Sequence, residues 1–411
     1  MKILMLSKEG DGLGLAQRIA AEGHDLKLFI ENPKYRNAGV GIVDRVPSWR
    51  PHITETDLVV CDMVGFGNYE RLFRERGKPI ISCSKLMDAA ELDRARGMDL
   101  FTRSGVTVPF TQTYNDPSDA EELLSTFESG YVIKPHDNQA TSKTLVVRDP
   151  AQFRWALGLY NGTITVQQIV EGIEVSTEGW FNGRSFIKPY NHTFEEKRLL
   201  PEAGPNTGCM GNVVINAGEG NRLVEHTLSR VEPFLRRVGY RGPVDINCMV
   251  TADAAYGLEF TSRIGYDAIE ALMEGLQEPV TDLLFETALG VKKEMELGTD
   301  VMIAVRLSKA PWPMDEPPKD ELGMPIAGIT EDNIRHLFLT DILRDDDGSY
   351  RYAASDGVLM KATAHARTVN EERVRVYRTI DAIEYPDKQF RRDIGERVTA
   401  DIEKLKEWGW L

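Results

Sequence analysis

Two carboxylates in the middle of the chain have the spacing of a cation site. Asp245 lies at the start of the segment VDINCMV, and Glu259 lies in the segment GLEFTSR. The connecting TADAA is short, so we predict a two-strand hairpin that brings both carboxylates to the same end. Mg²⁺ prefers oxygen ligands and shares them with substrate phosphates, and Arg263 close by suits a developing phosphate charge. An ordinary hairpin with two solvated acids is the alternative interpretation.

Two lysines flank a polar loop in the first half of the chain. Lys134 ends the apolar segment YVIKP, and Lys143 follows the loop HDNQATS. A cation at the end of an apolar strand is costly unless an anion pairs with it, and a phosphate would serve. The alternative is a surface lysine at a strand end. A nearby segment, VQQIVEGIEVS, offers strand backbone near Ile169 and Val170 to an adenine and Glu174 to ribose hydroxyls; by itself it also fits an edge strand with a charged turn.

Two glycine-rich loops could present backbone amides to an anion. GPNTGCMG, at residues 204–211, follows EEKR, and glycine has no Cβ to block the approach of a small anion. KEGDGLG, at residues 8–14, matches the dinucleotide-binding pattern in part only, and an ordinary turn explains it equally well. A dinucleotide site would need an acidic residue further along to hold the ribose, and Glu31 is the candidate.

The composition excludes several classes of function. The chain has 411 residues, 42% of them hydrophobic, and a formal net charge of −15, which argues against a general binder of nucleic acid or of membrane surfaces. Its four cysteines form no Cys-x-x-Cys pair, so we expect reduced thiols in a cytoplasmic protein. The start, MKILML, is too short for a signal peptide and is expected to be a strand, and no apolar run reaches the roughly 18 residues of a membrane span.

The order of elements predicts a mixed fold of α/β and α+β parts. Residues 1–107 alternate strands and helices, which predicts a parallel α/β domain, with Ser84 as the N-cap of one long helix that ends at Gly105. Residues 108–292 contain short strands, a hairpin at Asn182-Gly183 and a helix at residues 222–238, and residues 293–411 form a third, α+β part.

Three segments in this order carry a resemblance to a known family. They are EEKR followed by GPNTGCMG (residues 195–211), GLEFTSRIG (residues 257–265) and FRRDIG (residues 390–395). The chain resembles the ATP-grasp ligases, and among them the phosphoribosylamine–glycine ligases, over essentially its full length. The resemblance implies a pre-ATP-grasp domain, a two-lobed ATP-grasp domain with a mobile lid around residues 130–190, and a C-terminal domain.

The resemblance also implies roles for individual residues. The ATP phosphates would be contacted by Arg94, Lys134 and Lys143, and the nucleoside by Gln167, the Val170 backbone and Glu174. Arg94 and Gln167 stand where the family has lysine and glutamate. The metal would be bound by Glu259, with Asp245 and Thr261; Thr261 replaces the family's asparagine, so Asn247 or water would complete the site.

The transfer chemistry is assigned in the same way. Lys197, Arg198 and Arg263 would stabilise the transferring phosphoryl group and the acyl phosphate. The carboxylate substrate would lie in the loop formed by Gly204, Pro205, Asn206, Thr207, Gly208, Cys209, Met210 and Gly211. Cys209 replaces a glycine, and a tolerated small side chain explains it better than a nucleophile. The implied cofactors are ATP and Mg²⁺, or Mn²⁺ in its place; the partners are a small amino acid and an amine, and the chain is expected to be a monomer or homodimer.

The departures from the family concern the acceptor side. The first glycine loop lacks the family's Arg-Glu-His, Tyr-Asp-Ala follows Arg263-Ile264-Gly265 in place of Asp-Pro-Glu, and LSKAPWP replaces a glycine-rich segment. We therefore expect an ATP-dependent carboxylate–amine ligase that joins glycine or another amino acid to an amine, with a genuine phosphoribosylamine–glycine ligase as the alternative. A non-catalytic nucleotide-binding module and, on GDGLG alone, a dinucleotide-dependent oxidoreductase are the hypotheses from other classes.

Overall fold

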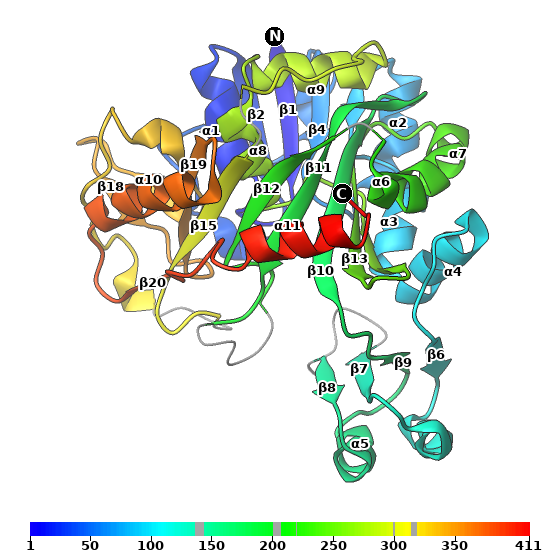
Figure 1. Ribbon diagram of the computed structural model, residues 1–411. Coiled ribbons are helices and arrows are strands. Elements are labelled where there is room, and N and C mark those ends of the chain that lie inside the picture. The colour runs from blue at the N-terminus through cyan, green and yellow to red at the C-terminus, as the bar shows by residue number, and fades with distance from the viewer. Residues whose placement is uncertain (136–143, 200–206, 219, 299–300, 314–318) are drawn as a thin grey trace.

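The computed structural model describes residues 1–135, 144–199, 207–218, 220–298, 301–313 and 319–411. Three sheets dominate it (Figure 1): a parallel sheet formed by the N-terminal residues, a large central sheet, and a small sheet that projects away from the rest. Four of the predicted site residues lie outside the described residues: the phosphate contact Lys143, and Gly204, Pro205 and Asn206 of the substrate loop.

The N-terminal sheet is parallel throughout, as the alternation of strands and helices predicts. Its order is β3 (Asp44–Arg45), β2 (Asp25–Ile30), β1 (Lys2–Ser7), β4 (Leu58–Cys61) and β5 (Ile80–Ile81). β1, β4 and β5 are almost entirely apolar because both faces of the sheet are covered there. The covering helices include α1 (Leu13–Ala21), α2 (Glu70–Glu75) and, from a distant part of the chain, α9 (Val280–Leu289).

The single long helix predicted after Ser84 is wrong, because the structure has two separate helices there. They are α3 (Lys85–Leu92) and α4 (Arg94–Ser104). Asp93 between them is extended, and its side chain accepts hydrogen bonds from the amides of Ala95 and Arg96, which starts a new helix. Ser84 makes no side-chain cap, whereas the helical end at Gly105 is as predicted. The break makes Arg94 the first residue of α4.

The small projecting sheet is a lobe with its own hydrophobic core. It is antiparallel, in the order β6 (Thr111–Tyr114), β9 (Ile164–Gln168), β7 (Tyr131–Pro135) and β8 (Leu145–Val147). The 3₁₀ helix η4 (Pro117–Thr126) and α5 (Pro150–Leu157) pack on it. Its buried side chains form a cluster separate from the main core. The lobe does not coincide with the lid predicted for residues 130–190. Its strands and helices lie within residues 111–168, whereas residues 173–190 belong to the central sheet.

The central sheet joins segments from the two later parts of the chain. Its order is β14 (Ala255–Thr261), β13 (Gly242–Val250), β10 (Ile173–Phe181), β11 (Phe186–Glu196), β12 (Gly211–Ala217), β15 (Val301–Lys309), β19 (Val358–Ala366) and β16 (Leu337–Leu339), with β20 (Lys388–Gln389) beside β15. The sheet thus crosses the boundary predicted between residues 292 and 293. The division into three domains stays a prediction.

Helices cover both faces of the central sheet, and all of its strand pairs are antiparallel. The helix predicted for residues 222–238 is interrupted at Thr227, whose backbone leaves helical geometry. A two-stranded ribbon pairs β17 (Ile342–Arg344) with β18 (Tyr350–Tyr352). The remaining helices are α6 (Arg222–His226), α7 (Leu228–Val238), α8 (Ala268–Gly275), α10 (Val369–Ala382) and α11 (Val398–Glu407), the last of which crosses the front of the sheet in Figure 1.

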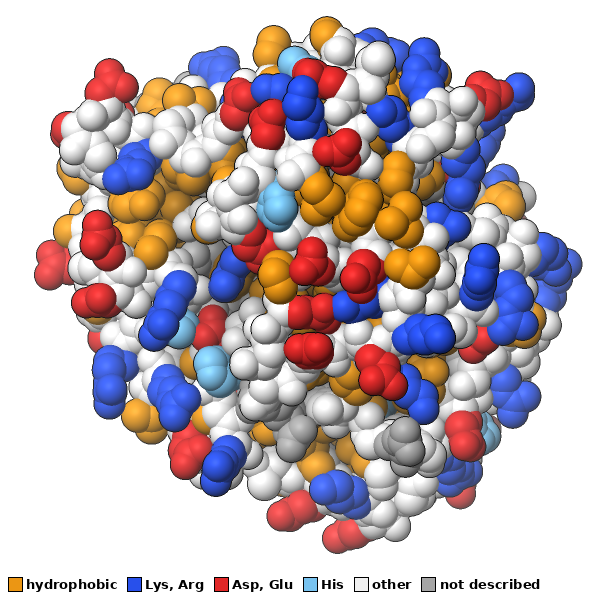
Figure 2. Space-filling model, turned by 90° about the horizontal axis from the view of Figure 1, so that it is seen from above, with side chains coloured by type: hydrophobic (Ala, Val, Ile, Leu, Met, Phe, Trp, Pro, Cys, Tyr) orange, Lys and Arg blue, Asp and Glu red, His pale blue; other side chains and the backbone are white. Residues whose placement is uncertain are grey.

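The surface is charged and mixed rather than basic. On the face seen in Figure 2, acidic, basic and hydrophobic side chains are interspersed. Across the described residues no helix combines the length and apolar character needed to cross a membrane. The four cysteines are buried and free.

Candidate functional site

A cavity of about 750 Å³ lies between the projecting lobe and the central sheet. Many of the predicted residues line it, although they come from α4, from β7, β9, β10 and β14, and from the segments that follow strands. They are Arg94, Lys134, Gln167, Val170, Glu174, Lys197, Arg198, Thr207, Gly208, Glu259 and Arg263. A smaller adjoining cavity of about 190 Å³ shares Arg94, Lys134, Glu259 and Arg263 and adds Thr261. Tertiary folding therefore collects most of the predicted set around one space.

Lys134 is held at the lobe side of the cavity by Gln167. Lys134 Nζ donates to Gln167 Oε1 at 3.0 Å, and Gln167 Nε2 donates to Thr111 Oγ1 at 3.1 Å. Gln167 thus positions the lysine. Burial, reinforced by the nearby Arg94, lowers the pKa of Lys134 to about 8. A buried cation of this kind is stabilised by an anionic ligand.

Of the two residues predicted to offer their backbone to an adenine, only one remains available. The Ile169 amide donates to the Gly130 carbonyl at 3.1 Å, and the Ile169 carbonyl accepts from Ser129 Oγ at 3.3 Å. Ile169 therefore uses both backbone groups within the lobe. Val170, one residue on, lines the cavity, so the backbone contact to a base rests on Val170.

Two arginines reach the cavity from helix and strand ends. Arg94 Nε is buried and has no hydrogen-bond partner among the described residues, which is the state expected of a donor awaiting a ligand. Arg263 is oriented by Glu91 of α3, whose Oε1 accepts from Arg263 Nε at 3.1 Å. The other Glu91 oxygen accepts from the Ser262 amide at 2.7 Å, so one side chain fixes both backbone and guanidinium. The sequence analysis did not identify Glu91.

Lys197 is surrounded by three carboxylates. Its Nζ lies 2.8 Å from Glu174, 3.4 Å from Glu195 and 3.5 Å from Glu259. Burial opposes its charge, but these carboxylates raise the pKa of Lys197 well above its usual value. In return Lys197, with Lys134 and Arg94, lowers the pKa of Glu259 to about 2. Lys197 therefore neutralises the acidic groups that a metal–nucleotide complex would approach. Glu195 was not among the predicted site residues.

β13 and β14 form the predicted hairpin, which brings Asp245 and Glu259 onto neighbouring strands. The two carboxyl groups differ in their exposure to the cavity. Asp245 pairs with Thr261 across the hairpin and Asn247 with Glu259. The Glu259 side chain is 48% exposed and lines both cavities, and Asn247 lines the larger one. Asp245 lines neither; burial and the neighbouring Glu178 and Glu195 raise its pKa well above normal.

The oxygen atoms at this site suit a divalent cation that is bound partly by the protein and partly by substrate phosphates. In the described part of the chain no group of three or more histidine, cysteine, aspartate and glutamate side chains could hold a metal ion by itself. Glu259 offers a carboxylate to the cavity, with Asn247 opposite it and Thr261 next to it on the same strand. Mg²⁺ is commonly held by one or two carboxylates together with substrate phosphates. Glu259 and Asn247 are accordingly the residues that would hold it.

The described part of the substrate loop folds back onto the EEKR segment. The Thr207 amide and hydroxyl both donate to the Lys197 carbonyl, at 2.7 and 2.8 Å, and the Met210 amide donates to the Glu196 carbonyl at 2.7 Å. Gly211 has a φ of +155°, and a Cβ there would lie 2.8 Å from both the Ala304 carbonyl and Ile394. Glycine is needed here because two other segments press against the loop.

Two of the family-like motifs meet beside this loop. Arg391 of FRRDIG donates through Nη1 to the Arg198 carbonyl at 2.7 Å, although the residues are 193 positions apart. Arg397 holds both oxygens of Glu196 at 2.8 and 2.7 Å. The C-terminal segment thus holds the EEKR segment in place through hydrogen bonds and ion pairs. The motif FRRDIG signalled Arg391 in the sequence; nothing there signalled Arg397.

Cys209 is buried in this loop. Burial, followed by the charge of Asp267, raises the pKa of its thiol well above normal, which disfavours the thiolate. The prediction that Cys209 is a packing residue is consistent with this position. The other glycine loop carries Glu9 and Asp11 before α1, an arrangement that repels phosphate and disfavours a dinucleotide there. Glu31, the candidate ribose ligand, is ion-paired to Lys8.

Comparison with known proteins agrees with the family resemblance. No family model matches the chain. The phosphoribosylamine–glycine ligase of Leifsonia xyli subsp. xyli is 26% identical over 346 residues, 79% of this chain and 80% of that protein. That of Phenylobacterium zucineum is 27% identical over 433 residues, 97% of this chain and 99% of that protein.

Solved structures share the fold. The phosphoribosylamine–glycine ligase of Thermotoga maritima superposes with a TM-score of 0.75 at 20% identity, covering 96% of this chain and all of that one (100%). The biotin carboxylase of Campylobacter jejuni, solved as an ATP-analogue complex, gives a TM-score of 0.68 at 13% identity, covering 95% and 93% of the two chains. The chain therefore has the ATP-grasp fold.

Proposed function

We propose that this protein is an ATP-dependent ligase that joins a carboxylate to an amine through an acyl phosphate and releases ADP and phosphate. The observation that carries the proposal is the convergence of Arg94, Lys134, Lys197 and Arg263 on one cavity that also exposes Glu259. Such a set of cations with one exposed carboxylate suits a nucleotide triphosphate and its metal. The similarity to phosphoribosylamine–glycine ligases over most of the chain supports the same class of reaction.

In the first step an oxygen of the carboxylate substrate attacks the γ-phosphorus of ATP, and the bond to the leaving ADP oxygen breaks. Lys134 and Arg94 would bind the phosphates, while Lys197 and Arg263 stabilise the charge of the transferring group. The loop at residues 204–211 would hold the carboxylate. Mg²⁺, when bound, supplies further neutralisation of phosphate charge; Glu259 and Asn247 would hold it.

In the second step the amine attacks the acyl carbon, the C–N bond forms, and phosphate departs with the electron pair of the C–O bond. No protein nucleophile is required, which agrees with the buried, weakly acidic thiol of Cys209. Positioning and electrostatic stabilisation would supply the rate enhancement. We propose glycine or another amino acid as the carboxylate. The names of the relatives favour glycine and phosphoribosylamine as the second candidate pair.

The four buried free thiols support the predicted reducing, cytoplasmic compartment. Whether the protein is a monomer or homodimer stays a prediction.

Hydroxylamine trapping tests the proposed function directly. Hydroxylamine is a small nucleophile that converts an acyl phosphate to a hydroxamate without a specific acceptor. Purified protein with Mg-ATP and each proteinogenic amino acid in turn should form a hydroxamate and ADP in equal amounts with one or a few of them. Binding of ATP without hydroxamate from any amino acid would instead favour the non-catalytic module. Amide formation from glycine and phosphoribosylamine would establish the second candidate pair.

A further inference from the structure

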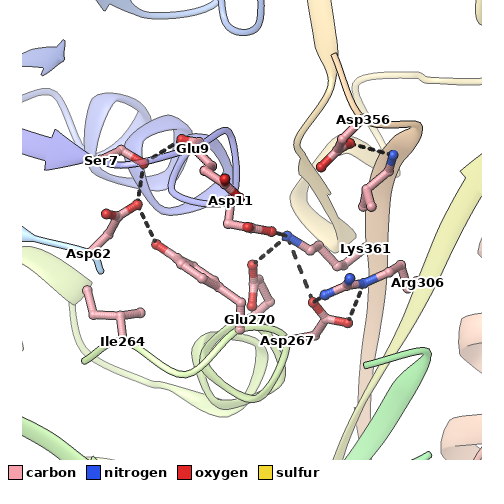
Figure 3. Close-up of polar contacts among 12 residues, drawn as sticks. Ser7, Glu9, Asp11, Asp62, Ile264, Asp267, Glu270, Arg306, Asp356 and Lys361 are labelled. Atoms are coloured by element: carbon pink, nitrogen blue, oxygen red, sulfur yellow. Dashed lines mark hydrogen bonds and ion pairs between the residues drawn. The ribbon is translucent and has the colours of Figure 1, made fainter. Parts of the chain in front are cut away.

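A second group of charged side chains adjoins the substrate loop. Figure 3 shows it: Glu9 and Asp11 from the loop after β1, Asp62 after β4, Asp267 and Glu270 at α8, Arg306 of β15, and Asp356 and Lys361 around β19. The Arg306 amide donates to the Met210 carbonyl at 3.1 Å, and a Cβ on Gly208 would lie 4.0 Å from Arg306 Nη1. We call these eight residues the acidic cluster.

The inner part of the acidic cluster is balanced. Arg306 holds Asp267 by two hydrogen bonds, from Nε at 3.1 Å and from Nη2 at 2.7 Å. Lys361 Nζ donates to Asp11 at 3.1 Å and lies 3.5 Å from Glu270. Lys361, Asp267 and Glu270 have fully buried side chains. These pairs account for both cations of the acidic cluster.

The outer part is not balanced. Among the described residues Glu9, Asp62 and Asp356 make no ion pair within 4.0 Å, and their hydrogen-bond partners include the neutral Ser7, Tyr35 and Tyr266. Asp62 is fully buried, and its Oδ1 has no hydrogen-bond partner there. Both oxygens of the buried Glu270 likewise lack a hydrogen bond. The acidic cluster thus contains six carboxyl groups and two cations. Two further cations, Arg263 and Lys34, lower the pKa of Asp62 and of Glu9 respectively through longer-range electrostatic attraction.

The three outer carboxyls share a raised pKa. Burial, with help from Asp11, raises the pKa of Glu9, of Asp356 and of Asp62, the last to about 7. Such shifts mark carboxyls that burial and like charges bias toward the protonated form, and a cation bound beside them would favour the charged form. Glu9, Asp11 and Asp356 are only half-buried, so a ligand can reach them from solvent.

The outer carboxyls are held in place by other groups. The Tyr35 hydroxyl donates to Asp356 at 2.9 Å and lies 3.5 Å from Glu9. The buried carboxylate of Asp341 accepts from the amides of Ser355, Asp356 and Gly357, at 2.8 to 3.1 Å, which fixes the turn that carries Asp356. A turn anchored in this way keeps like charges together before any ligand arrives.

We propose that the acidic cluster binds the amine acceptor, and that this acceptor carries a second positive charge and no phosphate group. The inference rests on the proposed ligase function and names its substrate class. The reacting amine would attack the acyl carbon next to the substrate loop and pass its proton to the leaving phosphate. The second, cationic group would lie against Glu9 and Asp356, the outer carboxyls that solvent reaches. A phosphate there would face those same carboxylates.

The test compares three acceptors that differ only at the far end: butylamine, putrescine and aminobutyl phosphate. The assay measures amide formation with Mg-ATP and the amino acid identified by hydroxylamine trapping. We expect kcat/KM to be at least about tenfold higher for putrescine than for butylamine, and lower for aminobutyl phosphate than for either. A ranking with aminobutyl phosphate first or equal, efficient use of phosphoribosylamine, or no amide from putrescine would each overturn the inference.

A double variant locates the effect. Glu9→Gln combined with Asp356→Asn should raise the KM for putrescine about tenfold, with a smaller change for butylamine, because only putrescine uses the second charge. Asp346→Asn removes an exposed carboxylate away from the acidic cluster and is the matched control. Equal changes in KM for putrescine and butylamine would contradict the assignment.

Failure of this inference is distinguishable from failure of the proposed function. If the wild-type protein forms hydroxamate but does not prefer putrescine, the ligase proposal stands and the acceptor assignment falls. If it forms no hydroxamate and no amide, both fall.

Discussion

Lys197 Nζ lies 3.5 Å from Glu259 Oε1, although the two residues are 62 positions apart. The same ammonium contacts Glu174 and Glu195, so one cation pairs with three carboxylates in this cavity. A divalent cation held by Glu259 would have to replace this contact. Metal binding and the release of Lys197 toward the transferring phosphate are therefore expected to occur together.

Glu259→Gln should reduce hydroxamate formation by about a hundredfold or more, because the change removes the only negatively charged oxygen of the pair that would hold Mg²⁺ and the charge that pairs with Lys197. The rate should be measured over a range of Mg²⁺ concentrations. Glu232→Gln, which removes a carboxylate paired with Arg236 on the surface of α7, should behave as the wild type. Activity of Glu259→Gln within threefold of the wild type would exclude Glu259 as a metal ligand.

Lys134 predicts a pH dependence of nucleotide affinity. Its pKa is lowered to about 8, and bound phosphate favours the charged form. Affinity for ADP should be constant below pH 8 and fall about tenfold per pH unit above it, with proton uptake on binding near pH 8. Calorimetry in buffers of different ionisation enthalpy measures both. Lys134→Arg should lose this dependence, since arginine stays charged; a slope unchanged in that variant would assign the proton to another group.

Phe153→Ala should unfold the projecting lobe selectively. Phe153 is fully buried in the separate lobe core, with ring centroids 5.8 Å from Phe127 and 5.2 Å from Tyr131. Removing a buried phenylalanine costs about 3–5 kcal/mol, and this small core has little else to hold it. Hydrogen exchange should speed up across residues 111–168 and not in the central sheet. Trp155→Ala, on the same helix but 67% exposed, is the control; similar exchange in both variants would contradict a separate lobe core.

Glu274 predicts an acid-sensitive contribution to stability. Burial opposes its charge, but hydrogen bonds from His336 at 2.7 Å and His365 at 3.1 Å lower its pKa to about 2. The contribution is present above the unfolded-state pKa of about 4.3 and is lost as pH falls toward 2; its size is on the order of 3 kcal/mol.

Urea unfolding tests this for Glu274→Gln. The variant should have a lower free energy of unfolding at pH 7, and its difference from the wild type should shrink between pH 4.5 and pH 2. Glu403→Gln, at an exposed position of α11, serves as the control. A difference that does not change with pH would show that packing, and not charge, accounts for the loss.

Local patterns predicted several elements well. Alternating strands and helices gave the parallel N-terminal sheet, and Asn182-Gly183 and the TADAA connection gave two hairpins, because turn chemistry acts over a few residues. The predicted helices at residues 84–105 and 222–238 were each too long. Their interruptions at Asp93 and Thr227 depend on capping and on packing against other segments.

Residues that orient others were harder to predict than residues that face the cavity. Lys134 stood out because a charge at the end of an apolar strand needs a partner. Glu259 stood out through its spacing from Asp245, and Lys197 through the resemblance of its segment to the ligase family. Glu91 lies within α3 and Arg397 just before α11, and their roles depend on contacts with Arg263 and Glu196 far away in the chain. Long-range contacts of this kind leave no local pattern.

The sequence alone determined the class of fold, the motifs and the types of residue around the nucleotide site, because these follow from short-range periodicity and from resemblance. Tertiary structure decided the order of the central sheet, which places β10 between β13 and β11 and continues through β15 beyond residue 292. It also decided that Glu9, Asp62 and Asp356 share one acidic cluster beside the substrate loop. Strand order is set by the burial of whole sheet faces, and that is a property of the complete packed chain.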